Sequence, residues 1–203
     1  MITLKNISKS FGGLKAVQDV SIEIEKGSIT GLIGPNGAGK TTLFNIIAGF
    51  YKADAGSISL NNEDVSGLRS DQLFAKGLLR TFQIAHEFDN LSVRENLMMV
   101  PSDQAGENII NTWLFPGKIK KEEKINHDRA SEVMDFLGLY HLRNEKAGIL
   151  SGGQKKLLEL GRTMMVDAKI VLLDEVGAGV NKILIKKISK SIARLNRERG
   201  YTF

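Results

Sequence analysis

The chain has 203 residues, a formal net charge of +5 and a hydrophobic fraction of 42%, which is ordinary for a globular protein. It has no cysteine, which excludes a disulfide framework, a thiolate metal site and a catalytic thiol. It has neither a signal peptide nor an apolar run of the roughly 18 residues that span a bilayer, so we expect it to stay in the cytosol. The positive charge is explained by solubility alone, or by contact with an anionic membrane surface or nucleic acid; basic residues cluster modestly at 118–124 and 182–199.

Two half-buried strands are predicted near the N-terminus, at residues 2–7 and 20–24, because apolar and polar residues alternate there. Ser10-Phe11-Gly12-Gly13 lies between them. The Phe11 ring could stack on an adenine ring or belong to the core, and the sequence leaves both interpretations open.

A phosphate-binding loop is the strongest signal in the chain. Residues 34–42 fit the pattern G-x-x-x-x-G-K-[ST], between a predicted buried strand at 28–33 and a predicted helix at 40–48, with Gly49 just past the helix end. The stretch reads Gly34-Pro35-Asn36-Gly37-Ala38-Gly39-Lys40-Thr41-Thr42.

The residue types of this loop suit a triphosphate. Its glycines let the backbone turn with positive φ and approach the phosphates, so that the N–H groups form an anion nest beside the positive end of the helix dipole. Lys40 would reach the β- and γ-phosphates, and the Thr41 hydroxyl would ligate Mg²⁺.

Short elements follow this helix. A strand is predicted at 57–60, and Asn61-Asn62 after it favours a tight turn. A short helix is predicted at 70–76, capped by Ser70 or Asp71, and Thr81-Phe82-Gln83 should lie at a strand end.

Helical periods dominate from residue 84 to about 165. Helices are predicted at 93–99, at 121–137 with Gly138 as its stop, and at 153–165. We interpret 84–165 as a helical subdomain inserted into a core of 1–83 and 166–203. The stretch 102–117 is polar and irregular, and its Trp113 and Phe115 either pack locally or touch a partner.

A second strong signal is the apolar strand at 169–173, which ends in Asp174 and Glu175. Ligands of open α/β sheets lie at the carboxyl ends of strands, which would place both carboxylates beside the phosphate loop. Asp174 could then hold Mg²⁺, and Glu175 could orient and deprotonate an attacking water. The alternative is a strand end followed by solvated acids.

An amphipathic helix is predicted at 181–199, with Gly200 as its stop. Tyr201-Thr202-Phe203 looks like the opening of a further strand, which suggests that the sequence is a fragment truncated at its C-terminus.

Leu150-Ser151-Gly152-Gly153-Gln154, at the start of a predicted helix, is a second glycine-rich anion site in front of the Asp174 strand. With 34–42 and 170–175 in this order, the whole chain resembles the ATP-hydrolysing subunit of ABC transporters. The resemblance implies a P-loop NTPase core, which is an α/β fold with a mixed, largely parallel sheet, an antiparallel N-terminal portion and a helical subdomain.

The resemblance also implies roles for residues and partners. Phe11 would stack on the adenine of ATP, and Gln83 would touch Mg²⁺ and water. Ser151, Gly152 and Gly153, with Gln154, would contact the γ-phosphate of ATP held by a second ATPase subunit. The partners would be that subunit and the transmembrane permease subunits, with this chain peripheral on the inner face of the membrane.

The sequence departs from the family pattern at three points. Val176 stands where proline is usual, and Asn181 stands where aspartate is common. The family's switch histidine would come a few residues beyond Phe203, since His86, His127 and His141 lie elsewhere. The resemblance therefore implies nucleotide binding more firmly than hydrolysis by these 203 residues.

Within the family, Arg80-Thr81-Phe82-Gln83, the long 100–120 segment and Ala178-Gly179-Val180-Asn181 look like the ATPase subunits of branched-chain amino-acid importers. Such a subunit is expected to bind neither the solute nor nucleic acid. One alternative is a soluble ABC-type ATPase acting on nucleic acid or the ribosome, although these usually carry two ATPase units or a long coiled coil. Another alternative is a GTP-dependent switch, which would need an N-K-x-D motif to select guanine. Residues 181–184 lack the final aspartate of that motif.

Overall fold

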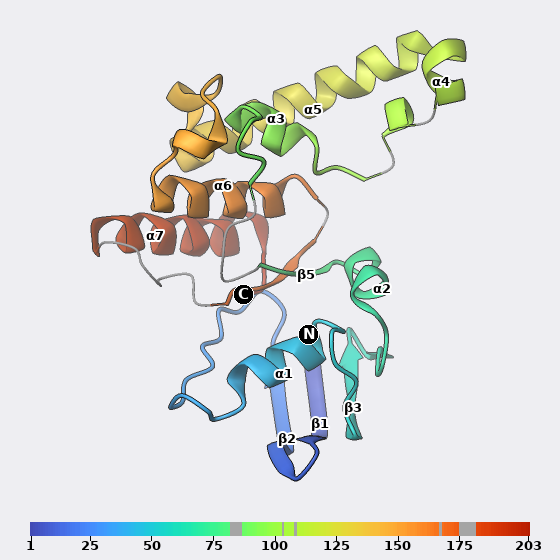
Figure 1. Cartoon of the computed structure of the whole chain (residues 1–203), viewed down its shortest axis with the longest axis vertical. Helices are drawn as coiled ribbons and strands as arrows, with labels where there is room; N and C mark the ends of the chain where they lie inside the picture. The colour runs from blue at the N-terminus through green and yellow to red at the C-terminus, as the bar shows by residue number, and fades with distance from the viewer. Residues whose placement is uncertain (82–86, 103, 108, 167, 175–181) are drawn as a thin grey trace. The chain divides into compact units, whose positions relative to one another are not determined.

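The computed structural model describes residues 1–81, 87–102, 104–107, 109–166, 168–174 and 182–203. The chain forms two compact units (Figure 1). The first unit comprises Met1–Phe82, Ala168–Glu175 and Ile192–Phe203, and the second comprises Gln83–Asp167 and Val176–Ser191.

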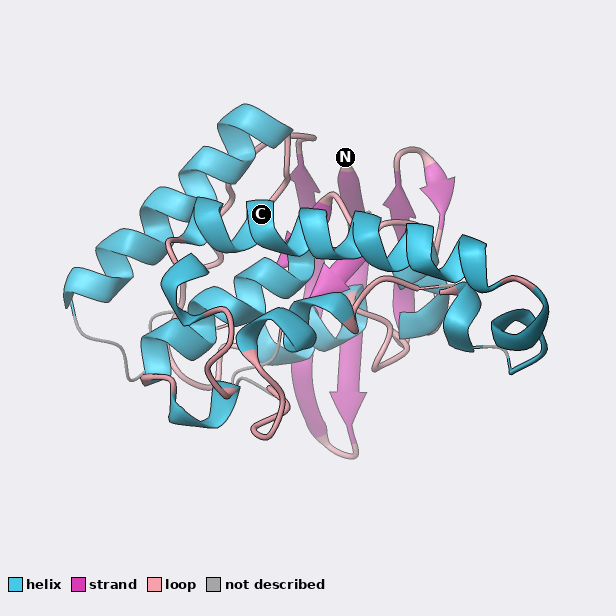
Figure 2. Ribbon diagram, turned by 90° about the horizontal axis from the view of Figure 1, so that it is seen from above, coloured by secondary structure: helices cyan, strands magenta, loops and turns pink. Residues whose placement is uncertain are grey.

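An antiparallel sheet forms one side of the first unit, with strand order β2-β1-β3-β4. Its strands are β1 (Ile2–Phe11), β2 (Leu14–Ile24), β3 (Ala55–Leu60) and β4 (Glu63–Asp64). The three strands predicted here are confirmed, and β1 and β2 extend further into a long hairpin (Figure 2). Asn61 and Asn62 both have positive φ, of 50° and 67°, as the tight turn between β3 and β4 requires.

Burial along β1 follows a bulge. Ile2 and Leu4 are buried at the spacing of two that one face of a strand demands. Asn6 then has a φ of 52°, and the pairing with β2 shifts between Leu4 and Ile7, which brings Ile7 back into the core.

A small parallel sheet pairs β5 (Leu78–Arg80) with β6 (Ile170–Leu172). The apolar strand predicted at 169–173 is thus confirmed in its central residues, all three of which are buried. Thr202 forms a parallel bridge with Ile170, so the predicted strand opening at 201–203 lies beside β6.

The buried strand predicted at 28–33 is wrong in this structure. The Ser28 N–H closes a turn onto the Glu25 carbonyl oxygen at 3.3 Å. Beyond that turn, the backbone of Ser28 and Thr30 bonds to Phe203 alone among the described residues, through Phe203 N–H to Ser28 O at 2.9 Å and Thr30 N–H to Phe203 O at 2.8 Å. A strand needs a continuous ladder of partners, and this one has a single residue opposite it. The side chains that follow stay exposed, Ile33 by 94%.

Helices α1 (Lys40–Ile47) and α2 (Ser70–Ala75) lie wholly within the first unit. Both were predicted. Leu43, Ile46 and Ile47 of α1 pack into one core with the sheet residues Ile2 and Leu4. The cap predicted for α2 is wrong by one residue, because Arg69 is the N-cap: its N–H donates to Gln72, and its guanidinium binds Asp71.

The second unit is helical. Three helices predicted from the sequence lie in it: α3 (Val93–Met98), α5 (Pro116–Leu137) and α6 (Gly152–Met164). The 3₁₀ turns are η1 (Ala105–Glu107), η2 (Tyr140–Leu142) and η3 (Ala147–Ile149). Helix α7 (Lys182–Arg199) begins in this unit and ends in the first. The predicted helices are confirmed, and Gly138 ends α5 with a φ of 67°.

Two boundaries in the second unit differ from prediction. Helix α5 begins at Pro116 rather than Lys121, because proline is favoured in the first turn, where no intrahelical N–H bond is lost. The stretch predicted as irregular contains a further helix, α4 (Ile109–Leu114), which is too short to show an apolar period.

Candidate functional site

The loop at 34–42 has the backbone geometry that its glycines predict. Gly37 and Gly39 have φ values of 83° and 80°, and Gly39 is the N-cap of α1. A Cβ on Gly39 would collide with the carbonyl oxygen of Ala16 in β2. Glycine is therefore required at position 39 both by its φ and by the close approach of β2.

Lys40 lies against its own loop. Its Nζ donates to the carbonyl oxygens of Gly34 and Pro35, at 2.7 Å each. Thr41 and Thr42 follow in the first turn of α1, exposed and half-buried respectively. An ammonium group, backbone N–H groups and hydroxyls thus gather at the positive end of a helix, which favours an anion.

A hollow of about 410 Å³ adjoins this loop. The loop contributes Gly37, Ala38, Gly39 and Lys40 to its wall, and β2 contributes Lys15, Ala16 and Val17. Its size is within the range of small-molecule sites. The sequence did not reveal that β2 lines this hollow, because the close approach of Gly39 to Ala16 arises only in the folded chain.

Phe11, at the end of β1, is 44% exposed. This exposure excludes the alternative that Phe11 is a core residue. Its ring meets Tyr51 edge-on, with centroids 5.3 Å apart, and the Lys9 ammonium lies 5.6 Å from its centroid. The ring is accessible for stacking.

Asp174 follows β6 and binds an arginine that the sequence reasoning missed. Arg80, the last residue of β5, donates from Nη2 to Asp174 Oδ2 at 2.8 Å and from Nη1 to Asn45 Oδ1 of α1. Asn45 lies one turn after Thr41 on the same helix face. Arg80 therefore ties the carboxyl end of β6 to the helix of the phosphate loop. In the sequence, Arg80 stands out only as part of a subfamily pattern, because its contacts depend on tertiary structure.

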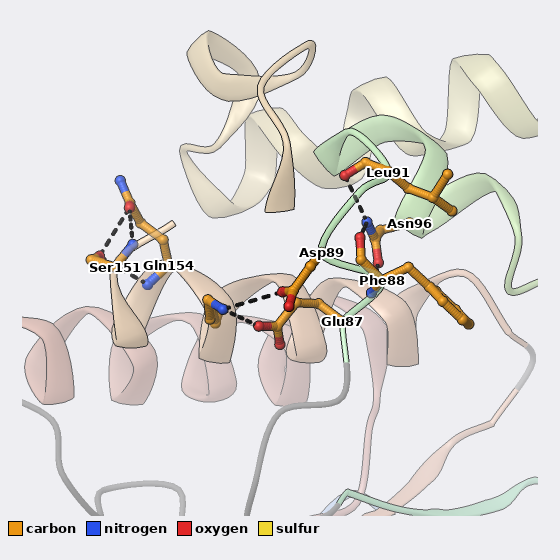
Figure 3. A network of polar contacts seen from close by, with 8 residues as sticks. Glu87, Phe88, Asp89, Leu91, Asn96, Ser151 and Gln154 are labelled. Atoms are coloured by element: carbon orange, nitrogen blue, oxygen red, sulfur yellow. Dashed lines mark hydrogen bonds and ion pairs between the residues drawn. The ribbon is translucent and has the colours of Figure 1, made fainter. Parts of the chain in front are cut away.

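Ser151 and Gln154 form a capping box at the start of α6 (Figure 3). The Ser151 N–H donates to Gln154 Oε1 at 2.8 Å, and the Gln154 N–H donates to Ser151 Oγ at 3.4 Å. Gly152 is exposed, and Gly153 is buried against Leu184 of α7, whose side chain a Cβ at 153 would strike. Ser151 and Gly152 thus present a helix N-terminus to the solvent.

The helix that begins with this box is anchored at Lys155. Its ammonium pairs with Glu87 and with Asp89, the latter at 3.5 Å, and the hydrogen bond to Glu87 raises the pKa of Lys155 (Figure 3 shows both acids). Asn96, fully buried in α3, accepts from the Phe88 N–H and donates to the carbonyl oxygens of Phe88, Leu91 and Ser92. These contacts hold residues 87–92 on the second unit.

Two predicted catalytic residues, Gln83 and Glu175, lie outside the described residues, as do Val176, His86 and the stretch 178–181. Among the residues described, no group of three His, Cys, Asp or Glu side chains is placed to hold a metal ion. Within the same part of the chain, no helix is long and apolar enough to cross a bilayer.

Comparison with known proteins decides the family. A model described as "ABC transporter" matches residues 17–178. The chain is 41% identical over 203 residues to a protein of Archaeoglobus fulgidus named "Probable branched-chain amino acid transport ATP-binding protein LivG", covering 100% of this chain and 77% of that protein. The chain belongs to the ABC transporter family.

Solved structures agree with this ABC family assignment. The ADP conformation of an ATP-binding cassette of an ABC transporter is similar with a TM-score of 0.83 and 39% identity, over 100% of this chain and 79% of that one. A dimeric cassette in a post-hydrolysis state with ADP and Pi is similar with a TM-score of 0.76 and 26% identity, over 100% and 85%. The predicted fold class, a P-loop NTPase core in an ABC transporter ATPase, is confirmed.

Proposed function

We propose that this chain binds MgATP at residues 34–42 and hydrolyses it to drive import of branched-chain or other hydrophobic amino acids. The observation that carries the proposal is the hollow walled by Gly37, Gly39 and Lys40, at the N-terminus of the helix that Arg80 connects to Asp174. The names of the relatives support the solute class and favour transport over an ATPase acting on nucleic acid.

The described residues fit a bound MgATP. The Lys40 ammonium, now held by two carbonyl oxygens, would exchange them for phosphate oxygens, and Phe11 would stack on the adenine. Thr41 and Asp174 would hold Mg²⁺, which proteins usually bind through one or two carboxylates together with substrate phosphates. The remaining loop residues, Gly34, Pro35, Asn36, Ala38 and Thr42, would complete the phosphate cradle.

Two further residues complete the proposed chemistry. Gln83 would touch Mg²⁺ and the attacking water, and Glu175 would orient and deprotonate that water. General-base help of this kind is worth about 10²–10⁴ in rate.

The capping box at 151–154 would act on a second subunit. We assign Ser151, Gly152, Gly153 and Gln154 to the γ-phosphate of ATP held by a partner ATPase, which the exposed helix start and the dimeric relative support. Permease subunits would be the other partners, with this chain peripheral on the inner face of the membrane. The solute would contact the permease rather than this chain, and no nucleic acid partner is expected.

We further propose that the core comprises about 1–83 and 166–203, and the helical subdomain about 84–165. The compact division of the chain near residues 82 and 167 supports these two boundaries. The second unit additionally takes up residues 176–191.

Nucleotide titration tests the proposal. Lys40→Ala should weaken ATP and ADP binding by roughly ten- to a hundredfold, because hydrogen bonds to charged groups are worth about 1.5–3 kcal/mol. Lys26→Ala is the matched control, since Lys26 is an exposed lysine of the preceding turn. Unchanged affinity in the Lys40 variant would overturn the phosphate assignment, and stronger competition by GTP than by ATP would overturn the choice of base.

A further inference from the structure

The second unit carries a cluster of exposed apolar side chains where α4 meets α5. We call Ile109, Trp113, Leu114 and Phe115 the apolar corner. Ile109 is 87% exposed and Trp113 is 89% exposed, while Leu114 and Phe115 are more than half exposed. Of the two alternatives left by the sequence, local packing of Trp113 is therefore excluded. Burial of this apolar surface therefore requires a binding partner.

Lysines follow directly on the outward face of α5. Lys120, Lys121 and Lys124 are exposed and share one face at spacings of three and four, which we call the basic stripe. No acidic side chain among the described residues pairs with these three lysines. The nearby Glu122 is engaged elsewhere, by the Ala105 N–H at 2.9 Å and by Lys118 at 3.8 Å.

The charge of this face changes sign along the helix. Continuing the stripe by steps of three or four residues gives Asp128, Glu132 and Asp135, all exposed. The three unpaired lysines thus lie in the part of α5 next to the apolar corner, with the exposed Glu123 among them, whereas the same face farther along the helix is acidic. Figure 1 shows α4 beside the N-terminal end of α5. Because Lys118 and Glu122 pair with each other, the three lysines outweigh Glu123 and leave excess positive charge on this part of α5.

We propose that the apolar corner and the basic stripe dock the second unit onto an anionic lipid surface. Tryptophan and phenylalanine favour the boundary between headgroups and acyl chains, where an apolar body can be buried shallowly. Lysines beside them would meet the phosphates of anionic headgroups, each adding to the attraction. This inference goes beyond the proposed function, since lipid contact requires neither nucleotide nor permease.

The chemistry favours lipid over other occupants. The lysines could bind the phosphates of a nucleic acid, but a nucleic acid would not bury the aliphatic side chains of Ile109 and Leu114. A protein partner would suit the apolar corner but would not by itself explain why the basic residues are grouped beside it. A bilayer with anionic lipids satisfies both at once, over a surface that needs no matching groove.

Trp113 is the single tryptophan of the chain, so its fluorescence reports directly on the corner. The full chain is mixed with vesicles of phosphatidylcholine alone, or of phosphatidylcholine with an equal amount of phosphatidylglycerol. We expect Trp113 emission to move to shorter wavelength, and the chain to co-sediment, with the anionic vesicles at low salt. Both effects should weaken at high salt, because screening shortens the reach of the lysines to a few ångströms at about 1 M.

Three variants that keep Trp113 sharpen the test. Lys120→Gln/Lys121→Gln/Lys124→Gln should lower vesicle affinity by at least about tenfold, given the usual contribution of a lysine near an anionic surface. Leu114→Ser/Phe115→Ser should abolish the wavelength shift. Lys182→Gln/Lys186→Gln/Lys190→Gln removes three exposed lysines of α7 and lowers the net charge equally, and it should bind vesicles nearly as the unchanged chain does.

The same samples are checked by far-UV circular dichroism and by ADP titration, so a folding defect or a failure of nucleotide binding is seen separately. The proposal is overturned if anionic vesicles leave Trp113 emission unchanged, as they would if a permease or a second copy of this chain were the occupant. It is also overturned if neutral vesicles bind equally well, or if the α7 variant loses as much affinity as the α5 variant.

Discussion

At the scale of single residues, Gly39 shows how one backbone angle and one close approach shape the phosphate loop. Gly39→Ala must accept a φ near 80° and a collision with the Ala16 carbonyl oxygen. Gly37→Ala is its matched control, because position 37 has the same kind of φ, at 83°, but open space around its Cβ. Both variants should lose more than about 1 kcal/mol of unfolding free energy. Gly39→Ala should lose more, together with ADP affinity; equal losses in denaturant titrations would show that the collision is relieved without cost.

Arg80 is the second residue whose contribution can be isolated. Its side chain is only 10% exposed, it binds Asp174 and Asn45, and its Nε has no partner among the described residues. Arg80→Gln should lower the unfolding free energy by roughly 1–3 kcal/mol, because it leaves the half-buried Asp174 carboxylate without its charged hydrogen-bond partner. It should also weaken the dependence of ADP affinity on Mg²⁺ if Asp174 holds that ion.

An arginine–aspartate pair in the same unit provides the control for Arg80. Arg69 binds Asp71 at 2.8 Å, but both side chains are mostly exposed. Arg69→Gln should leave stability nearly unchanged, since water and salt screen such pairs. Equal effects of the two substitutions in urea unfolding would contradict the structural importance of Arg80.

Local chemistry decided which site residues the sequence could reveal. Lys40 and Ser151 belong to motifs whose spacing reports their local geometry. Arg80 and Ala16 reach the site through neighbouring strands, so their importance depends on contacts distant in sequence. The sequence left two interpretations of Phe11 open, because aromatic residues occur both in cores and on binding surfaces. The exposed fraction of the side chain distinguishes them.

At the scale of elements, the two serine caps separate a structural role from a functional one. Ser92 caps α3 and pairs with Glu95 as Ser151 caps α6 and pairs with Gln154. Ser92→Ala and Ser151→Ala should therefore each cost about 1 kcal/mol of unfolding free energy. In a Glu175→Gln background, only Ser151→Ala should reduce the doubling of solution mass that we expect with MgATP. Equal loss of the dimer in both variants would assign the effect to helix stability instead.

Elements with their own stop signals were predictable, and elements that depend on a neighbour were not. Gly138 ends α5 and the Asn61-Asn62 pair turns β3 into β4, because each adopts a positive φ that few other residues tolerate. The stretch at 28–33 also carries apolar residues, Ile29, Leu32 and Ile33, yet beyond its turn to Glu25 its backbone pairs with Phe203 alone among the described residues. Apolar composition indicates that burial is favourable, but it supplies no hydrogen-bond ladder.

At the scale of the whole molecule, the two-unit organisation follows from a change of period along the sequence. Alternation by two dominates the N-terminal strands and gives way to helical spacing after residue 84. The allocation of α7 was not predictable in this way. Its apolar positions repeat evenly along its length, although its first ten residues belong to one unit and the rest to the other.

Acid should destabilise both units. Asp54 accepts hydrogen bonds from Lys9 and the Ser10 N–H, which lower its pKa below the ordinary 3.8. Bonds to the Ser92 side chain and N–H lower the pKa of Glu95 in the second unit below 4.5. Because the pKa of each carboxyl is lower in the folded chain, the unfolded chain binds more protons between the two pKa values. The stability that each carboxyl contributes is therefore fully present above its ordinary pKa, and it is lost as the pH falls through its pKa in the folded chain.

Denaturant unfolding between pH 6 and about 2.5 checks this expectation, since that range covers the ordinary pKa values of both carboxyls. Asp54→Asn removes the titrating group but keeps an oxygen that can accept from Lys9, so its stability should vary less with pH than that of the unchanged chain. Asp19→Asn is a suitable comparison, because Asp19 is an exposed carboxylate of the β1–β2 hairpin that Asp54 contacts. Among the described residues its carboxylate binds only the neutral Asn6 amide, at 2.7 Å. A pH profile that Asp54→Asn leaves unaltered would show that the Lys9 pair forms equally in the unfolded chain. A profile flattened as much by Asp19→Asn would trace the acid sensitivity to the overall charge of the hairpin.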